Sequence, residues 1–395
     1  MNMNKFKIIS LFSGIGAFER ALDKLNVDYE VVNYCEIDKY ASKSYSLIHN
    51  VPESKNLGDI SKVDFDSLPK DIDLVTYGFP CQDISMAGLQ KGFFDSEGNL
   101  TRSGLFFEAL KVIKSTNTKF AIAENVKALT SKTFTNEFAI VLKSLEELGY
   151  NNYFQVLNAK DYGMPQNRER VFVVSIRKDI DNGKFEFPNK IKLEKRLVDY
   201  LEDSVDKKYY INDLSKCSID SGYKQEPEEL NFGNLWGLSN TVSRKVNGRQ
   251  SVNNPGCSMV GGFNGRTFGG TYHQGDRLYD SDFISTCLTT GQGGSAVYVV
   301  PETDNTLDCD YLERLPNGDL RKIEDNSEIT DEMNLCRVRR LTPKECFRLT
   351  GFDDADCELL LEKGQSETQI YKRAGNSIVV NVLYYLMKNL LKVIR

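Results

Sequence analysis

The chain has 395 residues, of which 50 are basic and 56 acidic, so its formal net charge is −6. Basic residues usually support binding to phosphates, and this balance therefore argues at first against a nucleic-acid ligand. Hydrophobic residues make up 40% of the chain and charged residues 27%, values that are ordinary for a globular protein. At this length we expect two or three domains.

The N-terminal sequence has one short apolar run and no small-residue cleavage site, so it does not resemble a signal peptide. The longest apolar runs, such as 171–176, are far shorter than the ~18 residues of a membrane span. The nine cysteines form no CxxC pair, and the two histidines are His49 and His273, which argues against a disulfide framework and a metal site. We therefore expect a protein of the reducing cytoplasm, without a metal.

From the N-terminus to about residue 177, β-rich runs alternate with helical periods. Strands are predicted over 7–12, 29–36, 73–78, 120–124, 153–158 and 170–177. Helices are predicted between them over 18–25, 38–49, 105–115 and 135–148. This alternation is typical of a doubly wound, Rossmann-like α/β sheet, on which ligands bind at the carboxyl ends of the strands.

The pattern changes after about residue 187. Residues 231–295 hold 13 of the 29 glycines and show little helical period, which predicts a second, smaller domain of short strands and loops. A last helix is predicted over 377–394 from its apolar spacing.

The first candidate site follows the first strand. Gly14 and Gly16 lie between a strand and a helix, where glycine lets the backbone approach a ligand, but the third glycine of the dinucleotide fingerprint is missing and a simple tight turn explains them equally well. Glu36 ends the second strand about 20 residues later, where a carboxylate commonly binds ribose hydroxyls. The carboxylate of Asp59 could accept a hydrogen bond from the amino group of an adenine. Each acid alone fits a helix cap or a surface charge, whereas together they favour an adenosine-containing cofactor.

The second candidate site is Cys81, which follows Pro80 just past a strand. A buried packing role is the usual one for cysteine, but the polar residues that follow favour presentation of a nucleophile. No histidine lies near it in the sequence, which disfavours a cysteine–histidine hydrolase. The glycine-rich stretch 86–104 fits either a surface connection or a functional lid.

Three further motifs carry polar side chains that are candidates for a site. Glu124 stands at the end of a strand, where a general acid or a surface charge fits. Arg168 and Arg170 alternate to one side of an extended chain, which suits a phosphate, a carbonyl oxygen or a solvated edge. Asn376 or Ser377 is expected to cap the last helix, and such a helix terminus also binds carboxylates.

Taken in order, the motifs resemble those of DNA (cytosine-5)-methyltransferases of the bacterial or phage restriction-modification type. The resemblance covers 8–177 and 340–380 and rests on FSGIG, CEID, GDI, GFPCQDIS, ENV, QNRER, RRLTPKECFRLTGF and AGNSIVV. It implies that Cys81 attacks C6 of cytosine, that Glu124 contacts N3, and that Arg170 lies near O2 with Arg168 in support.

The resemblance also implies a pocket for S-adenosylmethionine and a surface for DNA. The implied cofactor residues are Phe12, Gly14, Gly16, Glu36, Ile37, Asp59, Ile60, Pro80, Asn376 and Ser377. The implied DNA-binding residues are Gln82, Ser85 and Arg102 in a loop that closes over DNA, and Arg244, Arg249, Arg266 and Gln274 in a target-recognition domain.

The domain boundaries expected from the resemblance are a catalytic domain over 1–187, a target-recognition domain over 188–334, and a conserved part over 336–395 whose last helix returns to the first domain. The segment 301–335 holds 11 acidic and 3 basic residues, whereas 231–275 holds four basic residues and no acid. The negative charge of the chain is therefore largely local. We expect 301–335 to face away from DNA.

The expected function is methylation of cytosine C5 at a specific duplex sequence, by a monomer that is either solitary or linked to a restriction endonuclease. Two alternatives stay open at this point. An RNA cytosine methyltransferase shares this fold, although the long glycine-rich middle region favours DNA. A catalytically idle DNA-binding module is disfavoured by Cys81, Glu124, Arg168 and Arg170.

Overall fold

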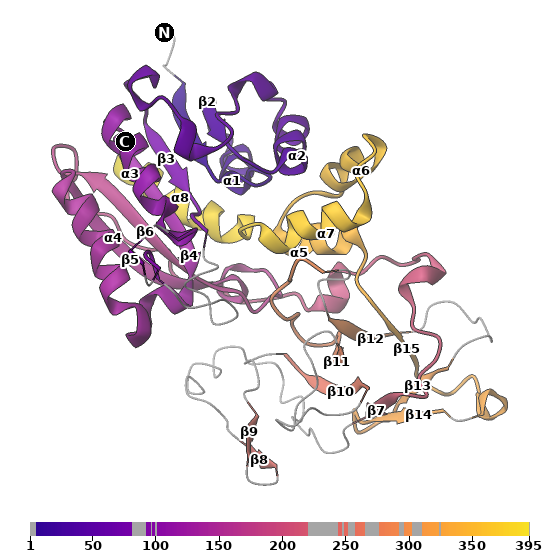
Figure 1. Cartoon of the computed structure of the whole chain (residues 1–395). Helices are drawn as coiled ribbons and strands as arrows, with labels where there is room; N and C mark the ends of the chain where they lie inside the picture. Colours follow the sequence, from indigo (N-terminus) through magenta and orange to yellow (C-terminus); the bar gives the residue numbers. More distant parts are fainter. Residues whose placement is uncertain are drawn as a thin grey trace. The chain divides into compact units, whose positions relative to one another are not determined.

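The computed structural model describes most of the chain (Figure 1). The described residues are 5–80, 92–95, 97–98, 101–219, 244–246, 249–251, 257–264, 276–291, 296–301, 310–323 and 325–394. They form two compact units. Unit 1 comprises Met1–Asn158, Glu169–Asn189 and Ser377–Arg395, and unit 2 comprises Ala159–Arg168 and Lys190–Asn376.

Unit 1 is built on a six-stranded sheet. Its spatial order is β2 (Tyr29–Cys35), β1 (Phe6–Leu11), β3 (Leu74–Tyr77), β4 (Phe120–Val126), β6 (Glu169–Arg177) and β5 (Tyr150–Asn158). The first four strands are parallel, whereas β6 runs antiparallel to β4, and β5 runs antiparallel to β6. All six predicted strands are present, and the α/β fold class is confirmed.

Helices alternate with these strands along the chain. They are α1 (Ala17–Lys24), α2 (Lys39–His49), α3 (Phe106–Thr116), α4 (Thr135–Glu147) and the C-terminal α8 (Val380–Ile394). The last helix returns to this unit from the far end of the sequence and packs against α1. The inner parallel strands β1, β3 and β4 are largely apolar because both of their faces are covered; Ile8 and Ile9 of β1 are fully buried.

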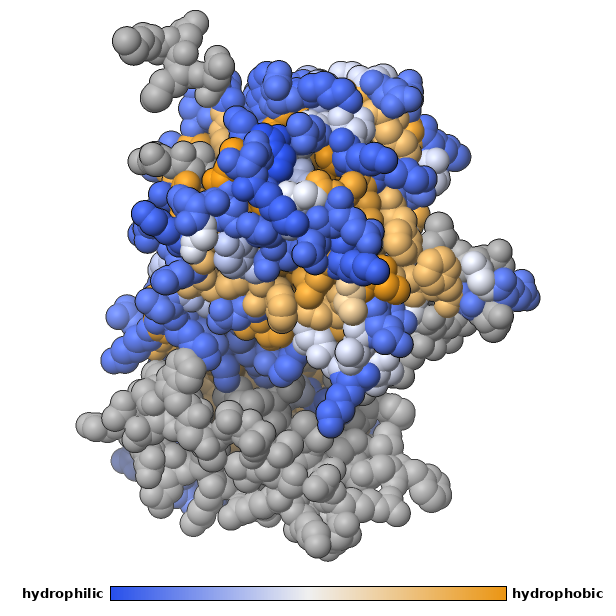
Figure 2. All heavy atoms as spheres, turned by 90° about the vertical axis from the view of Figure 1, so that its left-hand side faces the viewer, coloured by the Kyte–Doolittle hydropathy of each residue, from blue (hydrophilic) through white to orange (hydrophobic). Residues whose placement is uncertain are grey.

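Figure 2 shows the side of the molecule on which α4 lies in Figure 1. Hydrophilic residues cover most of the described surface in this view, and apolar residues gather in a smaller patch between them. The core of unit 1 is a cluster of buried apolar side chains from its strands and helices, among them Val75, Phe106 and Ile113.

Unit 2 contains a seven-stranded sheet of short strands. Its order is β14 (Leu320–Lys322), β13 (Leu312–Arg314), β15 (Leu335–Arg339), β12 (Val297–Pro301), β11 (Arg277–Asp280), β10 (Met259–Phe263) and β7 (Cys217–Ile219). The two edge strands β14 and β7 contact each other, so the sheet is curled. A separate hairpin consists of β8 (Arg244–Val246) and β9 (Arg249–Ser251). The strand-and-loop character expected of this region is present.

Three helices follow this sheet within unit 2: α5 (Pro343–Thr350), α6 (Asp354–Glu362) and α7 (Glu367–Asn376). The expected cap of the last helix at Asn376 or Ser377 is wrong, because α7 runs through Asn376 and α8 begins at Val380. The reason is packing: Ile370, Tyr371 and Ala374 are buried at helical spacing and carry the helix past Gly375.

A buried ion pair ties β15 to α5. Arg339 donates two hydrogen bonds to Glu345, of 2.8 and 2.6 Å, and the two side chains are only 2% and 0% exposed. Glu345 also accepts the backbone N–H groups of Thr342 and Glu202, each at 2.8 Å. Since Thr342 caps α5 and Pro343 occupies its first turn, this carboxylate fixes both the start of the helix and the strand before it.

We predict that Glu345→Ala lowers the free energy of unfolding by about 3–5 kcal/mol, because it leaves the buried guanidinium of Arg339 without its partner. The matched control is Glu358→Ala, which removes a half-exposed partner of Lys344 in the same unit and is expected to cost less than about 1 kcal/mol. Urea denaturation of the two variants measures the difference. Equal losses would contradict this account of the pair.

Candidate active site

The chain turns sharply where β1 ends. Phe12, Gly14 and Gly16 all have positive φ angles, of 52°, 57° and 78°. The backbone N–H of Ser13 donates to the carbonyl of Cys35 at 3.1 Å, so the turn lies at the carboxyl end of β2 as well. Two of the sequence-predicted motifs therefore meet at one edge of the sheet.

Glu36 joins these two motifs directly. Its carboxylate accepts the N–H of Gly14 at 2.9 Å and the N–H of Asp38 at 2.8 Å. Hydrogen bonds from backbone N–H groups to a carboxylate are among the stronger ones in proteins. The next residue, Ile37, is 74% exposed, an unusual position for a large apolar side chain.

The GDI motif lies beside them. Asp59 caps a single helical turn over Ile60–Lys62, because its Oδ1 accepts the N–H of Ser61 at 3.1 Å and the hydroxyl of Ser61 at 2.8 Å. These hydrogen bonds lower the pKa of Asp59. Ile60 is 3% exposed and belongs to the core of unit 1. The capping role considered for Asp59 is therefore present, and Ile60 supports the site from the core.

Glu124 and Arg170 form an ion pair at the same edge of the sheet. Arg170 Nε lies 3.0 Å from Glu124 Oε1, with side chains 19% and 13% exposed. The register of β4 and β6 pairs Val126 with Arg170, which places the two residues on neighbouring strands. A Cβ on Gly78 would lie 3.3 Å from Glu124 Oε2, so the carboxylate rests against the turn that follows β3.

The ENV and GFP motifs are also joined by Asn125. It is 2% exposed, and its amide donates to the carbonyl of Phe79 at 3.1 Å. The ring of Phe79 packs against Phe93 and Phe106, at centroid distances of 6.2 and 5.4 Å. The backbone before Cys81 is thus held from both sides up to the half-buried Pro80.

Cys81, Gln82 and Ser85 lie outside the described residues, as do Arg266 and Gln274. Arg102 is exposed at the turn before α3. Arg244 and Arg249 belong to the strands of the β8–β9 hairpin, where the register pairs Arg249 with Val246 and Arg244 with Ser251.

The expectation that Arg168 and Arg170 share one side of an extended chain is wrong. Strand β6 begins at Glu169, and the preceding residues form a tight turn in which the N–H of Arg168 donates to the carbonyl of Gln166. Arg168 is 5% exposed and donates to Cys287 Sγ and to the carbonyls of Leu288 and Gly375, at 3.1, 3.2 and 3.1 Å. Arg168 therefore links the turn before β6 to residues 287, 288 and 375 within unit 2. Its proposed role near the target cytosine stays a prediction.

Asn376 and Ser377 fall on either side of the division between the two units. Asn376 ends α7, whereas Ser377 is 7% exposed and its hydroxyl donates to the carbonyl of Ile378 at 3.1 Å. Their part in a cofactor pocket stays a prediction.

Sequence analysis missed His49, whose side chain contacts the turn that contains Gly14 and Gly16. Its Nε2 donates to the carbonyl of Ile15 at 2.9 Å, and its Nδ1 lies 3.8 Å from Asp23 Oδ2. A Cβ on Gly16 would lie 2.2 Å from the same Nε2. Glycine is therefore needed at this position by the histidine as much as by its φ angle. A polar ring at the end of an amphipathic helix was the available signal.

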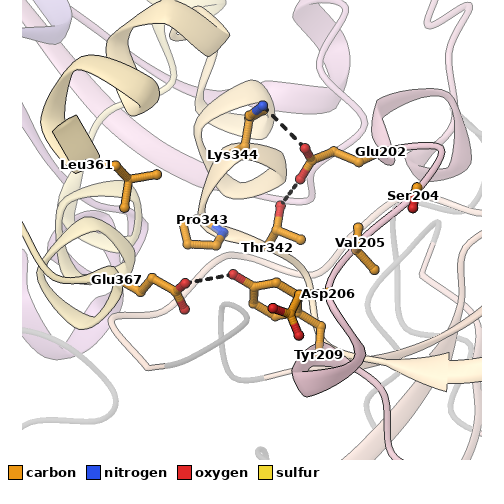
Figure 3. A pocket seen from close by; sticks show the side chains of 10 residues that line it. All are labelled: Glu202, Ser204, Val205, Asp206, Tyr209, Thr342, Pro343, Lys344, Leu361 and Glu367. Carbon is orange, nitrogen blue, oxygen red and sulfur yellow. Dashed lines mark hydrogen bonds and ion pairs between the residues drawn. The ribbon is translucent and has the colours of Figure 1, made fainter.

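A surface hollow of about 220 Å³ lies in unit 2 at the start of α5 (Figure 3). None of the sequence-predicted site residues lines it. Two acids in it are already paired: Glu202 accepts the hydroxyl of Thr342 at 2.6 Å, and Glu367 accepts that of Tyr209 at 2.9 Å. These contacts fit a polar junction between α5, α7 and the preceding loop.

No helix in the part of the chain that the structure describes is both long and apolar enough to cross a membrane. No group of three or more histidine, cysteine, aspartate or glutamate side chains among those residues is arranged to hold a metal ion.

Comparison with known proteins bears on the whole chain. The family model of C-5 cytosine-specific DNA methylases matches residues 6–392. The orphan methyltransferase M.SPRI of Bacillus phage SPR is 35% identical over 98% of each chain. The type II methyltransferase M.HhaI of Haemophilus parahaemolyticus is 30% identical over 97% of this chain and 94% of its own. The solved structure of the methyltransferase EhMeth of Entamoeba histolytica shares the fold, with a TM-score of 0.60 at 17% identity over 100% of both chains.

The sheet and the motifs gathered at its edge define a methyltransferase of the α/β class. The chain belongs to the C-5 cytosine-specific DNA methylase family, and its enzyme class is DNA (cytosine-5-)-methyltransferase. The resemblance found in the ordered motifs is thereby confirmed.

We predict that Gly16→Ala destabilises the protein by about 3 kcal/mol, since the new methyl group meets His49 and the residue keeps a strained φ. The control Gly149→Ala has a comparable φ of 91° but nothing within 4 Å of the new Cβ, and it is expected to cost about 1–2 kcal/mol. Thermal and urea denaturation report both values. Adding His49→Ala to Gly16→Ala should recover part of the loss, and no recovery would contradict the contact.

Proposed function

We propose that this enzyme transfers a methyl group from S-adenosylmethionine to carbon 5 of cytosine in a specific duplex DNA sequence, through a covalent adduct between Cys81 and C6. The observation that carries the proposal is the Glu124–Arg170 ion pair, which lies at the carboxyl end of β4 against Gly78, three residues before Cys81. The target base has to leave the duplex first, which costs roughly a few kcal/mol.

The chemistry assigns a task to each of these side chains. Carbon 5 of cytosine is a poor nucleophile, so the thiolate of Cys81 adds to C6 and the electron pair of the C5–C6 double bond becomes available at C5. In this proposal Glu124, whose Oε1 lies 3.0 Å from Arg170 Nε, gives its carboxyl proton to N3 of the base as the thiolate adds, which neutralises the charge of the adduct. In this proposal Arg170 neutralises negative charge that develops on the base during the addition.

A bound cofactor would supply an electrophilic methyl group to C5 and would leave as S-adenosylhomocysteine. Loss of the C5 proton to a base, return of the N3 proton to Glu124 and expulsion of the Cys81 thiolate then restore the aromatic ring. A free cysteine is only a few per cent thiolate at neutral pH. The proposal therefore requires a cation to favour the thiolate, and it assigns this part to Arg170.

The residues around Glu36 fit the adenosine part of this cofactor. The N–H groups of Gly14 and Asp38 hold the Glu36 carboxylate just beyond β2, the position from which a carboxylate commonly binds the hydroxyls of a ribose. A Cβ on Gly14 would meet nothing within 4 Å, so the backbone there is open to a ligand. The exposed side chain of Ile37 offers an apolar contact for a base.

We further propose that duplex DNA contacts the acid-free stretch 231–275, of which Arg244 and Arg249 lie in the β8–β9 hairpin. A two-stranded ribbon of this kind fits the major groove. The acidic stretch 301–335 would then face away from DNA. The cellular role proposed is protection of DNA by a cytoplasmic, monomeric modification methylase, either solitary, as the phage relative is named, or linked to a restriction endonuclease.

We predict that Cys81→Ser abolishes transfer of a labelled methyl group from S-adenosylmethionine to genomic DNA, because a serine hydroxyl is a far weaker nucleophile than a thiolate. The matched control is Cys217→Ser, a half-buried cysteine in β7 that has no assigned task and is expected to leave activity unchanged. Full activity of Cys81→Ser would overturn the mechanism. Label in transfer RNA but not in DNA would favour the RNA alternative, and binding without turnover on any substrate would favour an idle module.

We predict that Arg244→Ala and Arg249→Ala each reduce the slope of log affinity for duplex DNA against log salt by about 1, as expected when one phosphate contact is lost. The matched control is Arg321→Ala, a half-exposed arginine of β14 within the acidic stretch, which should leave the slope unchanged. Fluorescence anisotropy across a salt series gives the slopes. A change in the slope for Arg321→Ala alone would reverse the proposed orientation.

A further inference from the structure

One asparagine outside all the predicted motifs contacts two of them. Asn56 lies in the segment between α2 and the GDI motif, and it forms an isolated parallel bridge with Tyr34 at the end of β2. Neither its residue type nor its spacing marked it as a site residue.

The side chain of Asn56 uses its whole hydrogen-bonding capacity. Its Oδ1 accepts the backbone N–H groups of Glu36 and Gly58, at 3.0 and 2.9 Å. Its Nδ2 donates to the carbonyl of Glu36 and to the hydroxyl of Ser42, both at 2.9 Å. Two donors and two acceptor positions are all that a carboxamide has, and the three backbone partners fit only one orientation of the amide.

We propose that Asn56 is a positioning residue for the cofactor, one that holds the Glu36 backbone and the Gly58 turn in register so that the Glu36 carboxylate meets the ribose hydroxyls. The inference rests on the proposed function, since it deepens the role of the site around Glu36.

We call the four hydrogen bonds of the Asn56 side chain the Asn56 clamp. The position of Glu36 explains why this clamp is needed. Glu36 follows the last residue of β2, so the sheet no longer supplies partners for its N–H and C=O groups. Asn56 supplies both. Asn56 holds the backbone of Glu36 while the N–H groups of Gly14 and Asp38 contact its carboxylate, so loss of Asn56 would let the backbone shift and carry the carboxylate away from these two donors.

Ser42 extends the clamp to the second turn of α2. Its hydroxyl, which accepts from Asn56, also lies 3.0 Å from that of Tyr34, and both residues are buried. The clamp therefore joins the end of β2, the helix that follows it and the segment that leads into Asp59. A side chain that spans three segments at a ligand-binding edge influences affinity more than it influences the chemical step.

The test is the affinity of the full-length enzyme for S-adenosylmethionine, measured by calorimetry. Asn56→Ala is expected to weaken binding about tenfold, in line with the loss of hydrogen bonds worth a kcal/mol or so in net terms. At saturating cofactor kcat should stay close to that of the unmodified enzyme, so the change appears in KM for the cofactor. The matched control is Asn33→Ala, also an asparagine that contacts the segment before the GDI motif. It lies in β2, and its substitution removes a single hydrogen bond from the side-chain amide to the carbonyl of Lys55. This variant should leave the affinity for S-adenosylmethionine unchanged.

A second variant and a double-mutant cycle separate positioning from folding. Asn56→Asp keeps the size of the side chain and the acceptor but places an oxygen where the donor was, so it should also weaken binding while melting close to the unmodified protein. In a Glu36→Ala background Asn56→Ala should cost little further affinity, because the carboxylate it positions is gone.

The outcomes distinguish the two proposals. If the unmodified enzyme does not bind S-adenosylmethionine, or Glu36→Ala binds it equally well, the proposed cofactor site is wrong and the inference falls with it. If Glu36→Ala weakens binding but Asn56→Ala behaves like Asn33→Ala, only the inference is overturned. Full additivity in the cycle would also overturn it, because it would show that Asn56 acts independently of Glu36.

Discussion

The parallel register of β2, β1, β3 and β4 is the constraint on which the candidate active site depends. Parallel strands bring their carboxyl ends to one edge, and the residues just beyond those ends come from four motifs that are far apart in the sequence. Gly14 and Glu36 meet there through a hydrogen bond, and Glu124 reaches the turn after β3. The antiparallel strand β6 adds Arg170 from a later part of the chain. One sheet edge thus carries both the proposed cofactor pocket and the proposed reaction centre.

Much of this arrangement could be predicted because it follows from local patterns. β-rich runs bounded by glycine and by polar residues marked all six strands of unit 1, and the pattern is clearest in the inner parallel strands β1, β3 and β4, which are buried on both faces. The identity of the enzyme came from the order of its motifs, which the family match confirmed. The resemblance implied only that Glu124 and Arg170 contact the same base, and their ion pair was not predicted, because a sequence does not state which strands are neighbours.

The features that sequence analysis got wrong or missed depend on partners distant in the chain. The sequence pattern predicted that Arg168 and Arg170 point to the same side of a strand. Arg168 instead donates hydrogen bonds to residues 287, 288 and 375, and no local sequence pattern predicts that these residues lie close to it. The same holds for Gly375: it stays helical within α7, and a Cβ there would lie 2.2 Å from the carbonyl oxygen of Thr289. His49 and Asn56 support the site through backbone atoms, and such contacts leave no motif behind.

The central claim is that this chain reacts with cytosine through Cys81, and covalent trapping tests it most directly. Duplex DNA in which 5-fluorocytosine replaces cytosine cannot lose a proton from C5 after methyl transfer, so the adduct should persist. The account predicts a chain–DNA adduct that forms only with S-adenosylmethionine and that mass spectrometry locates on Cys81. An adduct on another cysteine, or none from an enzyme that methylates ordinary DNA, would contradict it.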